Sequence, residues 1–357
     1  MTKVSIISGD YNNIDIKRLL ELINYIPSKK KILIKPNIAG IKHPNSPTIT
    51  NPKIIEALVI YLKPFSEEIV IAEGSVAGIS TKEAFRSAGY EDLSKKYDLK
   101  LIDLNDSQRI EKEWKFGKLK IPKILEDYEY INVAKMKTHI QTTATLAMKN
   151  QKGILHPEDK KRFHKSGKLP EMIKELNIIL KPDLNIIDAI DCIEGNGPGE
   201  EGKVKKINYI LASKDAQAID NVAIKIMDIH LTKVEYLETK DYELIGDPLK
   251  TIPFKLPDEH YTKLNLKLWF NNSCSGCNHN IMKSIRELPT HPFKMIKFAY
   301  NITLNTTNII AGPNTKNKPS KGRIICIGSC SKQFAEKNNC IYIEGCPPKT
   351  KDIIKKL

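Results

Sequence analysis

Six of the seven cysteines lie after residue 273, which indicates a metal centre because thiolates are ligands for soft metals. Four of the six each come just after a short apolar run, and these are Cys274, Cys277, Cys330 and Cys346. Four thiolates from separate loops suit either a tetrahedral zinc ion or a four-iron cluster in which each iron takes one sulfur. We therefore predict that these four cysteines hold a metal centre.

The residues beside these cysteines favour an iron–sulfur cluster over zinc. Gly276, Gly328 and Gly345 let the backbone approach closely, so that N–H groups can face cluster sulfides. A structural zinc site usually repeats a tight C-x2-4-C pair, whereas only Cys274 and Cys277 form such a pair among the four. Zinc and a site without metal remain alternatives.

Alternating strands and helices must position these thiols. We predict strands at 262–270, 308–311, 323–328 and 340–344 and helices at 280–288, 293–300 and 349–357. In an open parallel sheet, ligands bind outside the carboxyl ends of the strands, where the four cysteines fall. Cys326 lies inside a predicted strand and Cys340 opens one, so we interpret both as buried apolar side chains.

The last quarter of the chain resembles the small subunit of nickel–iron hydrogenases and the matching subunit of respiratory complex I. The resemblance rests on the motif order Cys-x-x-Cys, Ile-Ile-Ala-Gly-Pro at 309–313, Ile-Gly-Ser-Cys at 327–330 and Gly-Cys-Pro-Pro at 345–348. It implies a flavodoxin-like domain at 261–357 with a [4Fe–4S] cluster on Cys274, Cys277, Cys330 and Cys346.

Lysines gather at predicted strand ends in the first 260 residues. Lys35 and Asn37 follow one strand, and Lys135, Lys137 and His139 follow another that is predicted at 130–134. Further along the chain stand Lys149, Asn150 and the Gly-rich loop around Gly197. Several ammonium groups beside a Gly-rich backbone would suit a carboxylate or phosphate substrate. We predict catalytic roles for Lys137, His139 and Lys149 and substrate binding by Lys35, Asn37, Lys135, Asn150 and Gly197.

The same region alternates strands with helices, as in an α/β domain with a mainly parallel sheet. Strands are predicted at 3–8, 31–35, 68–72, 99–104, 130–134, 185–188 and 208–212, with helices at 16–25, 54–62, 80–89 and 216–227. Asn51-Pro52 is a typical helix start. Asp215 and Asp220 lie near the start of the helix at 216–227, where the helix dipole favours carboxylates, so a structural role and a functional role both remain open for them.

These lysine motifs resemble the domain of unknown function 362, found in many archaea and anaerobic bacteria. The resemblance runs from about residue 31 to residue 246 and includes Lys-Pro-Asn at 35–37, Lys-Met-Lys-Thr-His at 135–139 and Ala-Met-Lys-Asn at 147–150. The resemblance implies that the domain is joined to an iron–sulfur module, but it implies no particular reaction.

Charge and composition limit the partners. The net charge is +15, and residues 264–357 carry 13 lysines and 2 arginines against 4 acidic residues. Such a surface would attract an acidic electron carrier such as ferredoxin or flavodoxin, or it is an ordinary solvated face. No nucleic-acid-binding signature is present, so nucleic acid is not an expected partner. No apolar stretch reaches transmembrane length and no signal peptide is visible, so we expect a cytoplasmic protein without a membrane partner.

Two functional hypotheses follow. In the first, the protein is an iron–sulfur oxidoreductase that passes single electrons from the cluster to an anionic substrate or cofactor in the N-terminal domain, 1–260. In the second, it is a non-redox anion-binding or maturation protein with a structural metal site. The glycine-flanked cysteines favour the first hypothesis.

Overall fold

The computed structural model describes residues 1–76, 79–165, 168–257, 260–263, 265–270, 273–313, 315, 319 and 321–357. The chain divides into two compact units. Unit 1 comprises Met1–Lys160 and Leu169–Leu256, and unit 2 comprises Lys161–Lys168 and Pro257–Leu357. None of the described helices is both long and apolar enough to cross a membrane.

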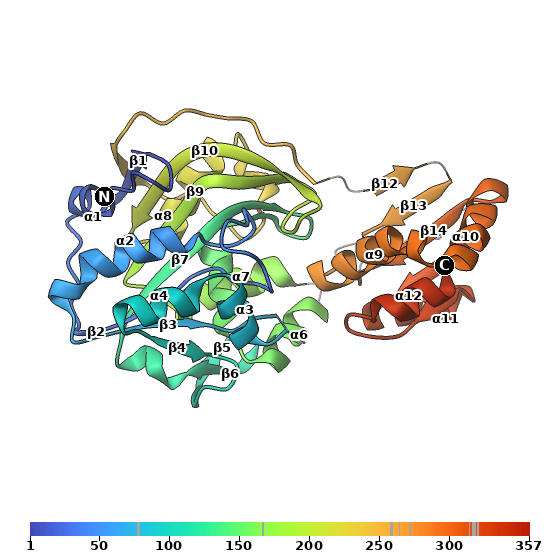
Figure 1. The fold of residues 1–357 in the computed structure, drawn as a ribbon, viewed down its shortest axis with the longest axis horizontal. Coiled ribbons are helices and arrows are strands. Elements are labelled where there is room, and N and C mark those ends of the chain that lie inside the picture. The colour runs from blue at the N-terminus through green and yellow to red at the C-terminus, as the bar shows by residue number, and fades with distance from the viewer. Residues whose placement is uncertain are drawn as a thin grey trace. The chain divides into compact units, whose positions relative to one another are not determined.

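Unit 1 is built on one large mixed sheet with the strand order β11-β1-β10-β9-β7-β2-β3-β4, and β8 pairs with β7 (Figure 1). The strands are β1 (Thr2–Ser8), β2 (Lys31–Lys35), β3 (Glu68–Glu73), β4 (Lys100–Asp103), β7 (Glu129–His139), β8 (Thr143–Thr145), β9 (Leu184–Gly195), β10 (Gly202–Ser213) and β11 (Tyr242–Gly246). Neighbouring strands from β9 to β4 are parallel, so their carboxyl ends share one edge. The predicted α/β class with a mainly parallel sheet is confirmed.

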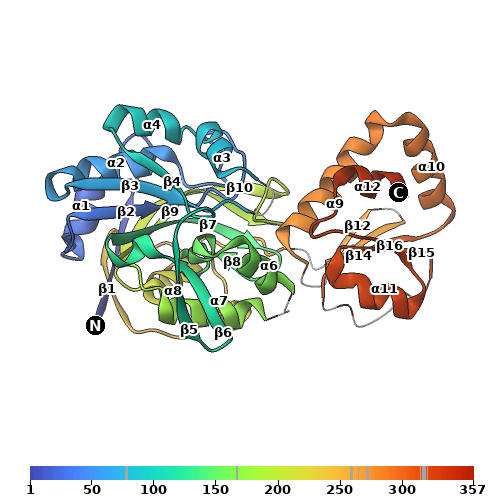
Figure 2. The same cartoon turned by 90° about the horizontal axis from the view of Figure 1, so that it is seen from below.

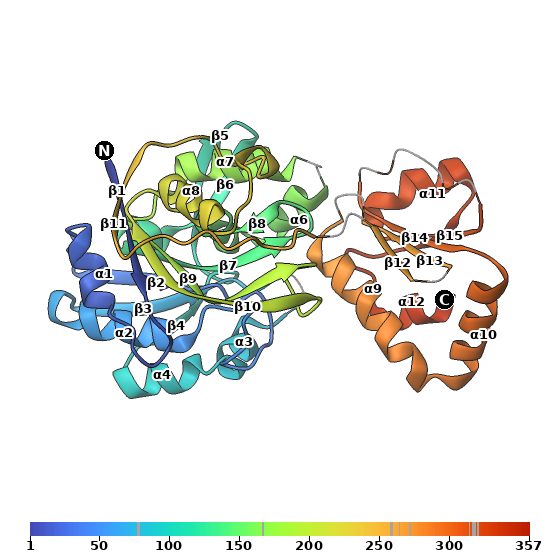
Figure 3. The ribbon, with the colours of Figure 1, turned by 90° about the horizontal axis from the view of Figure 1, so that it is seen from above.

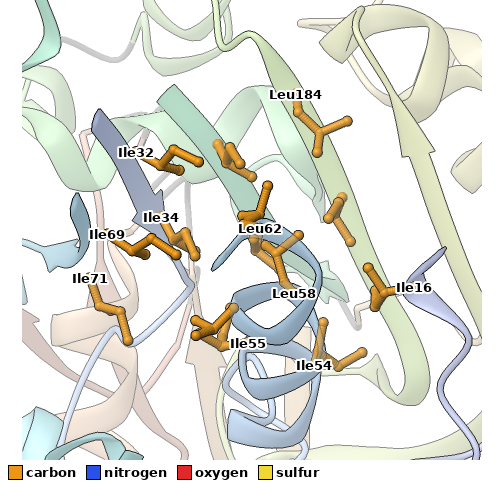
Figure 4. Packing of buried hydrophobic residues seen from close by; sticks show 14 of the residues in the cluster. Ile16, Ile32, Ile34, Ile54, Ile55, Leu58, Leu62, Ile69, Ile71 and Leu184 are labelled. Atoms are coloured by element: carbon orange, nitrogen blue, oxygen red, sulfur yellow. The ribbon is translucent and has the colours of Figure 1, made fainter. Parts of the chain in front are cut away.

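Helices cover both faces of this sheet (Figure 2). On one face lie α1 (Ile16–Leu22), α2 (Pro52–Leu62), α3 (Thr81–Ser87) and α4 (Tyr90–Tyr97), and on the other lie α7 (Leu169–Ile179) and α8 (Ala216–Ile226). The short helix α5 (Ala147–Asn150) contacts both α7 and α8. Asn51 caps α2 by accepting from the N–H of Lys53, as the Asn-Pro start predicts. Ile54, Leu58 and Leu62 then form one helical stripe that packs on the sheet (Figure 4).

Unit 2 is a second, smaller α/β sheet with the order β12-β13-β14-β15-β16. Its strands are β12 (His260–Lys263), β13 (Leu266–Trp269), β14 (Thr307–Ala311), β15 (Arg323–Ile327) and β16 (Ile341–Ile343), and all are parallel except β12. Figure 3 shows α9 (Ser275–Glu287), α10 (Pro292–Leu304) and α12 (Thr350–Lys356) on one side of the sheet and α11 (Lys332–Asn338) on the other. The consecutive strand order differs from the flavodoxin order 2-1-3-4-5.

Several predicted elements have different bounds. The single strand expected at 262–270 is a hairpin of β12 and β13, and Leu264 at its turn lies outside the described residues. β7 does not end at Ala134 but continues to His139, because the Lys-Met-Lys-Thr-His motif alternates side chains like a strand and pairs with β8. The hairpin of β5 (Arg109–Trp114) and β6 (Gly117–Pro122) was not predicted.

Candidate functional site

A buried ion pair joins two strand ends in unit 1. Lys35 closes β2 and Glu73 closes β3, and the Lys35 Nζ lies 2.8 Å from Oε2 of Glu73. Both side chains are almost fully buried. The Glu73 carboxylate also accepts from the backbone N–H groups of Ile38 and Gly74, which compensates part of the cost of burying it. The cation and the anion lie together because neighbouring parallel strands end at the same edge of the sheet, where ligand-binding residues are expected.

A chain of side-chain amides connects this pair to Lys137. Lys137 Nζ donates to Oδ1 of Asn37 at 2.7 Å and to the Thr48 carbonyl at 2.8 Å. Asn37 Nδ2 donates in turn to Oδ1 of Asn150 at 2.8 Å, and Lys35 Nζ approaches the same oxygen at 3.4 Å. The structure therefore brings Lys35, Asn37, Lys137 and Asn150 into one buried network.

Lys149 has fewer hydrogen-bond partners than the other buried lysines of this region that the structure describes. It lies on α5, and in the described part of the chain its Nζ has one hydrogen-bond partner, Oγ1 of Thr145 at 3.4 Å. Burial, reinforced by the positive charges of Lys152 and Lys137, lowers the pKa of Lys149 well below its ordinary value. A buried ammonium group with so few partners favours an added anion.

Asp220 positions α5 and with it Lys149. Its two carboxylate oxygens accept from the N–H groups of Ala147 and Met148 at 2.8 and 3.0 Å, which are the first donors of α5. Asp220 therefore caps α5 and not its own helix, whereas Asp215 caps α8 through the N–H groups of Gln217 and Ala218. Burial raises the pKa of Asp220 to about 8.

Lys135 is engaged by a separate set of groups. Its Nζ lies 2.8 Å from Oδ2 of Asp188 and donates to the Tyr11 hydroxyl, and the Asp188 carboxylate also accepts from the N–H of Asn51. The side chains of Lys135 and Asp188 are fully buried. Lys135 thereby links β7 to β9 and to the start of α2, and its predicted contact with a substrate stays a prediction.

His139 and Gly197 lie at the far end of β7. His139 is buried, and its Nδ1 accepts from the N–H of Gln141 at 3.0 Å. The N–H of Gly197 donates to the Gly195 carbonyl at 2.7 Å, so this amide is already engaged in the described conformation. A side chain at position 197 would bring its Cβ 2.3 Å from the Thr138 carbonyl oxygen, so this position requires glycine for close packing on β7.

Lys160 belongs to the same buried cluster but was not predicted. It lies on α6 (Pro157–Lys165), and its Nζ donates to the Gly74 carbonyl at 2.7 Å and to Oδ1 of Asn105 at 2.9 Å. Burial lowers its pKa to about 7, although Glu73 opposes that shift. The segment Pro-Glu-Asp-Lys-Lys-Arg-Phe-His-Lys contains so many charged residues that no sequence signal marks Lys160 as a buried lysine.

The cluster contains more buried lysines than carboxylates. Its five lysines are Lys35, Lys135, Lys137, Lys149 and Lys160, each at most 8% exposed. The carboxylates within ion-pairing distance, among the residues described, are Glu73 for Lys35 and Asp188 for Lys135. Burial and the neighbouring charge of Lys135 lower the pKa of Lys137 to about 7. Three amines thus lack a carboxylate, and an anion bound among them would remove that deficit.

The four predicted metal ligands of unit 2 lie near one another. Cys274 caps α9 and Cys277 lies in its first turn, while Cys330 and Cys346 follow β15 and β16. A Cβ at Gly328 would lie 3.0 Å from the sulfur of Cys277 and 3.8 Å from that of Cys330. A hydrogen bond from Cys274 and the charges of Cys274, Cys330 and Cys346, together with burial, raise the pKa of Cys277. Four such thiols can ionise together only with a compensating cation.

The four cysteines match a metal site in the chemistry of their sulfur atoms, which are ligands for zinc and for iron–sulfur clusters. The Gly312 backbone N–H contacts the Cys330 sulfur and lowers its pKa, against the larger effect of burial. Among the described residues, no set of three or more His, Cys, Asp or Glu side chains is placed so that it could hold a metal ion. Cys326 is buried on the other face of the sheet among Ile310, Ile324 and Ala335, and Cys340 packs partly buried against that cluster.

Comparison with known proteins places the lysine cluster inside a recognised family. A sequence model described as "Domain of unknown function (DUF362)" matches residues 32–225. The "Thylakoid-associated protein sll1697" of Synechocystis sp. is 29% identical over 217 residues, which are 58% of this chain and 65% of that protein. This chain thus spans slightly less than two thirds of its curated relative. No solved structure is significantly similar. The matched residues include all five lysines and none of the four cysteines predicted to bind metal.

We expect Asp220→Ala to weaken both the fold and the cluster. The change leaves two buried N–H groups of α5 without acceptors, which costs about 1–3 kcal/mol, and it releases the helix that carries Lys149. Urea unfolding followed by circular dichroism measures the loss. Asp215→Ala is the matched control, because it removes the cap of α8 and leaves α5 in place. Equal stability of Asp220→Ala and the unchanged protein would contradict the assigned capping role.

Lys149→Met is expected to stabilise the protein at pH 7. Methionine has a similar length and no charge to desolvate, so the unfolding free energy should rise by about 1–3 kcal/mol. The melting temperature should then rise by roughly 3–8 °C, measured by calorimetry in buffer without added anions. Lys17→Met, at an exposed lysine, is the control and should leave the melting temperature unchanged. A lower melting temperature for Lys149→Met would show that Lys149 is a structural residue.

Proposed function

The chain belongs to the family of domain of unknown function 362, and we propose that it is an iron–sulfur oxidoreductase acting on a small anionic substrate. In this proposal unit 1 binds the anion at the lysine cluster, and unit 2 holds a [4Fe–4S] cluster. The observation that carries the proposal is the excess of buried lysine amines over carboxylates at the carboxyl edge of the unit 1 sheet. Natural proteins rarely retain unpaired buried lysines without a functional reason.

The substrate is proposed to be a carboxylate or a phosphate compound. Lys137 and Lys149 would hold the anion, and the network of Lys35, Asn37 and Asn150 would orient Lys137. Lys137, with a pKa of about 7, can donate or accept a proton at neutral pH, a property that suits a general acid. Reduction of an anion by added electrons makes it more basic, so a proton donor beside it is chemically appropriate.

The proposed cluster ligands are Cys274, Cys277, Cys330 and Cys346. A bound [4Fe–4S] cluster would supply electrons one at a time. The support is the proximity of the four thiols, the flanking glycines and the hydrogenase-like motif order. A non-redox protein with a structural zinc ion is the alternative, and metal analysis separates the two.

An acidic electron carrier such as a ferredoxin or flavodoxin is the proposed partner. Lys351 is exposed in the first turn of α12, shortly after Cys346, and gives this end of unit 2 a positive charge. Lys355 lies in the last turn of α12, at the opposite edge of the sheet, where Arg323 of β15 donates to the Lys356 carbonyl. Complementary charge would steer an acidic carrier toward the cluster. The cytoplasm, where thiols stay reduced, is the proposed location.

Serine at any one of the four ligand positions should abolish or strongly lower iron and sulfide content. The reason is that a cluster iron would lose its thiolate and gain a weaker hydroxyl ligand. Protein purified without air is assayed for iron, sulfide and zinc and examined by EPR after reduction. Cys326→Ser and Cys340→Ser are the controls and should retain the metal. One zinc per chain without iron would overturn the redox proposal.

Anion binding should weaken as pH rises through about 7. Lys137 is charged below its folded pKa of about 7 and neutral above it, and an anion attracts only the charged form. Binding therefore takes up a proton, and affinity should fall about tenfold per pH unit above pH 7 and level off well below it. Isothermal titration calorimetry with phosphate and with malonate from pH 6 to pH 9 measures this, and these probes are tested separately.

The matched variants make that measurement specific. Lys137→Met should remove most of the affinity and most of its pH dependence, whereas Lys17→Met should change neither. An affinity for both probes that is independent of pH, or equal in Lys137→Met and the unchanged protein, would contradict the assigned site.

A further inference from the structure

The helix α10 exposes a row of large apolar side chains, which we name the α10 stripe: Phe293, Ile296, Tyr300 and Leu304. These residues are 88%, 66%, 65% and 60% exposed. Their spacing of three and four residues places them on one helical face. A contiguous exposed row of this kind marks an interaction site more often than scattered surface residues do.

The opposite face of α10 already serves the fold. Phe298 is buried in the core of unit 2, and Ile302 packs against the same core. α10 is therefore apolar on two faces, and folding of unit 2 accounts for only one of them. Figure 3 shows α10 on the same side of the unit 2 sheet as α9 and α12, at the periphery of that unit. The α10 stripe is therefore available to bind a partner outside the chain.

The charge around the stripe favours a negatively charged partner. Lys294 and Lys297 lie on α10 itself, and Lys283 and Arg286 lie on the preceding α9. Residues 264–357 carry 13 lysines and 2 arginines against 4 acidic residues. Two copies of so basic a surface would repel each other, which disfavours self-association through the stripe.

The position of α10 disfavours an electron carrier as the occupant. α10 ends at Leu304 and β14 begins at Thr307, so this end of the helix lies at the amino edge of the parallel strands. Cys330 and Cys346 follow the carboxyl ends of β15 and β16, at the opposite edge. A partner on the stripe would leave the cysteines free.

We propose that the α10 stripe inserts into the interface of a membrane that contains anionic lipids, with Lys294 and Lys297 at the headgroups. Aromatic and aliphatic side chains on one helical face flanked by lysines are the features of helices that lie in a membrane surface. The anionic cytoplasmic leaflet attracts each such lysine. The proposal does not depend on the metal centre or on the lysine cluster.

The test is co-sedimentation of the full chain with phosphatidylcholine vesicles, with and without one quarter phosphatidylglycerol. We expect binding to the anionic vesicles and little to the neutral ones, with binding weakened by salt. Phe293→Ser with Ile296→Ser should lower the partition coefficient by roughly 30-fold or more, because the inserted apolar area is lost. Lys294→Glu with Lys297→Glu should lower it by about tenfold or more.

The matched control is Ile60→Ser with Ile178→Ser, two isoleucines of unit 1 that are 55% and 59% exposed. This variant should bind vesicles as the unchanged protein does. Circular dichroism checks that each variant is folded. Equal partition coefficients of the variant with Phe293→Ser and Ile296→Ser and of the control would overturn the proposal. Failure of the unchanged chain to bind anionic vesicles would also overturn it. The unchanged chain could instead form a dimer in sedimentation equilibrium and bind no vesicles. If only Phe293→Ser with Ile296→Ser abolished that dimer, the α10 stripe would be assigned to contact with a second copy.

Discussion

Burial of five lysine amines at one edge of a parallel sheet is the constraint on which unit 1 depends. Charged groups leave water only when other groups replace their hydration. Here the replacements are two carboxylates on β3 and β9, side-chain amides and backbone carbonyls in the loops after β2 and β3, and an amide on α5. The backbone must come very close to serve in this way. A Cβ at Gly153 would lie 2.4 Å from Oε1 of Glu73, and one at Gly74 would lie 2.8 Å from Nζ of Lys160.

This constraint also explains which parts of the site could be predicted from sequence. Lys35 and Lys137 follow from strand periodicity and from the rule that parallel strands end together. Their partners do not, because the pairing of Lys35 with Glu73 and of Lys135 with Asp188 depends on strand order, which sequence alone leaves open. The sequence places Asp220 near the start of its own helix but does not show that its carboxylate meets the N-terminus of α5, because that contact joins residues far apart in the chain.

The same distinction applies to unit 2. The βαβ pattern predicted β14, β15 and β16 closely, because short apolar runs between Gly and polar residues have few other conformations. It did not predict that residues 262–270 turn back as a hairpin, or that α10 would be apolar on two faces. The expectation of no membrane partner rested on the lack of a long apolar stretch, which tests for spanning helices and not for helices on a membrane surface.

The central claim is that the lysine cluster is completed by an anion, and the ionisation of Lys149 tests it most directly. NMR of protein labelled at lysine Cε and Nζ follows that titration, with Lys149→Met identifying the signal. Without an anion, Lys149 should titrate far below its ordinary pKa of 10.5, and saturating phosphate or malonate should raise its pKa. An ordinary pKa that neither anion moves would contradict the claim.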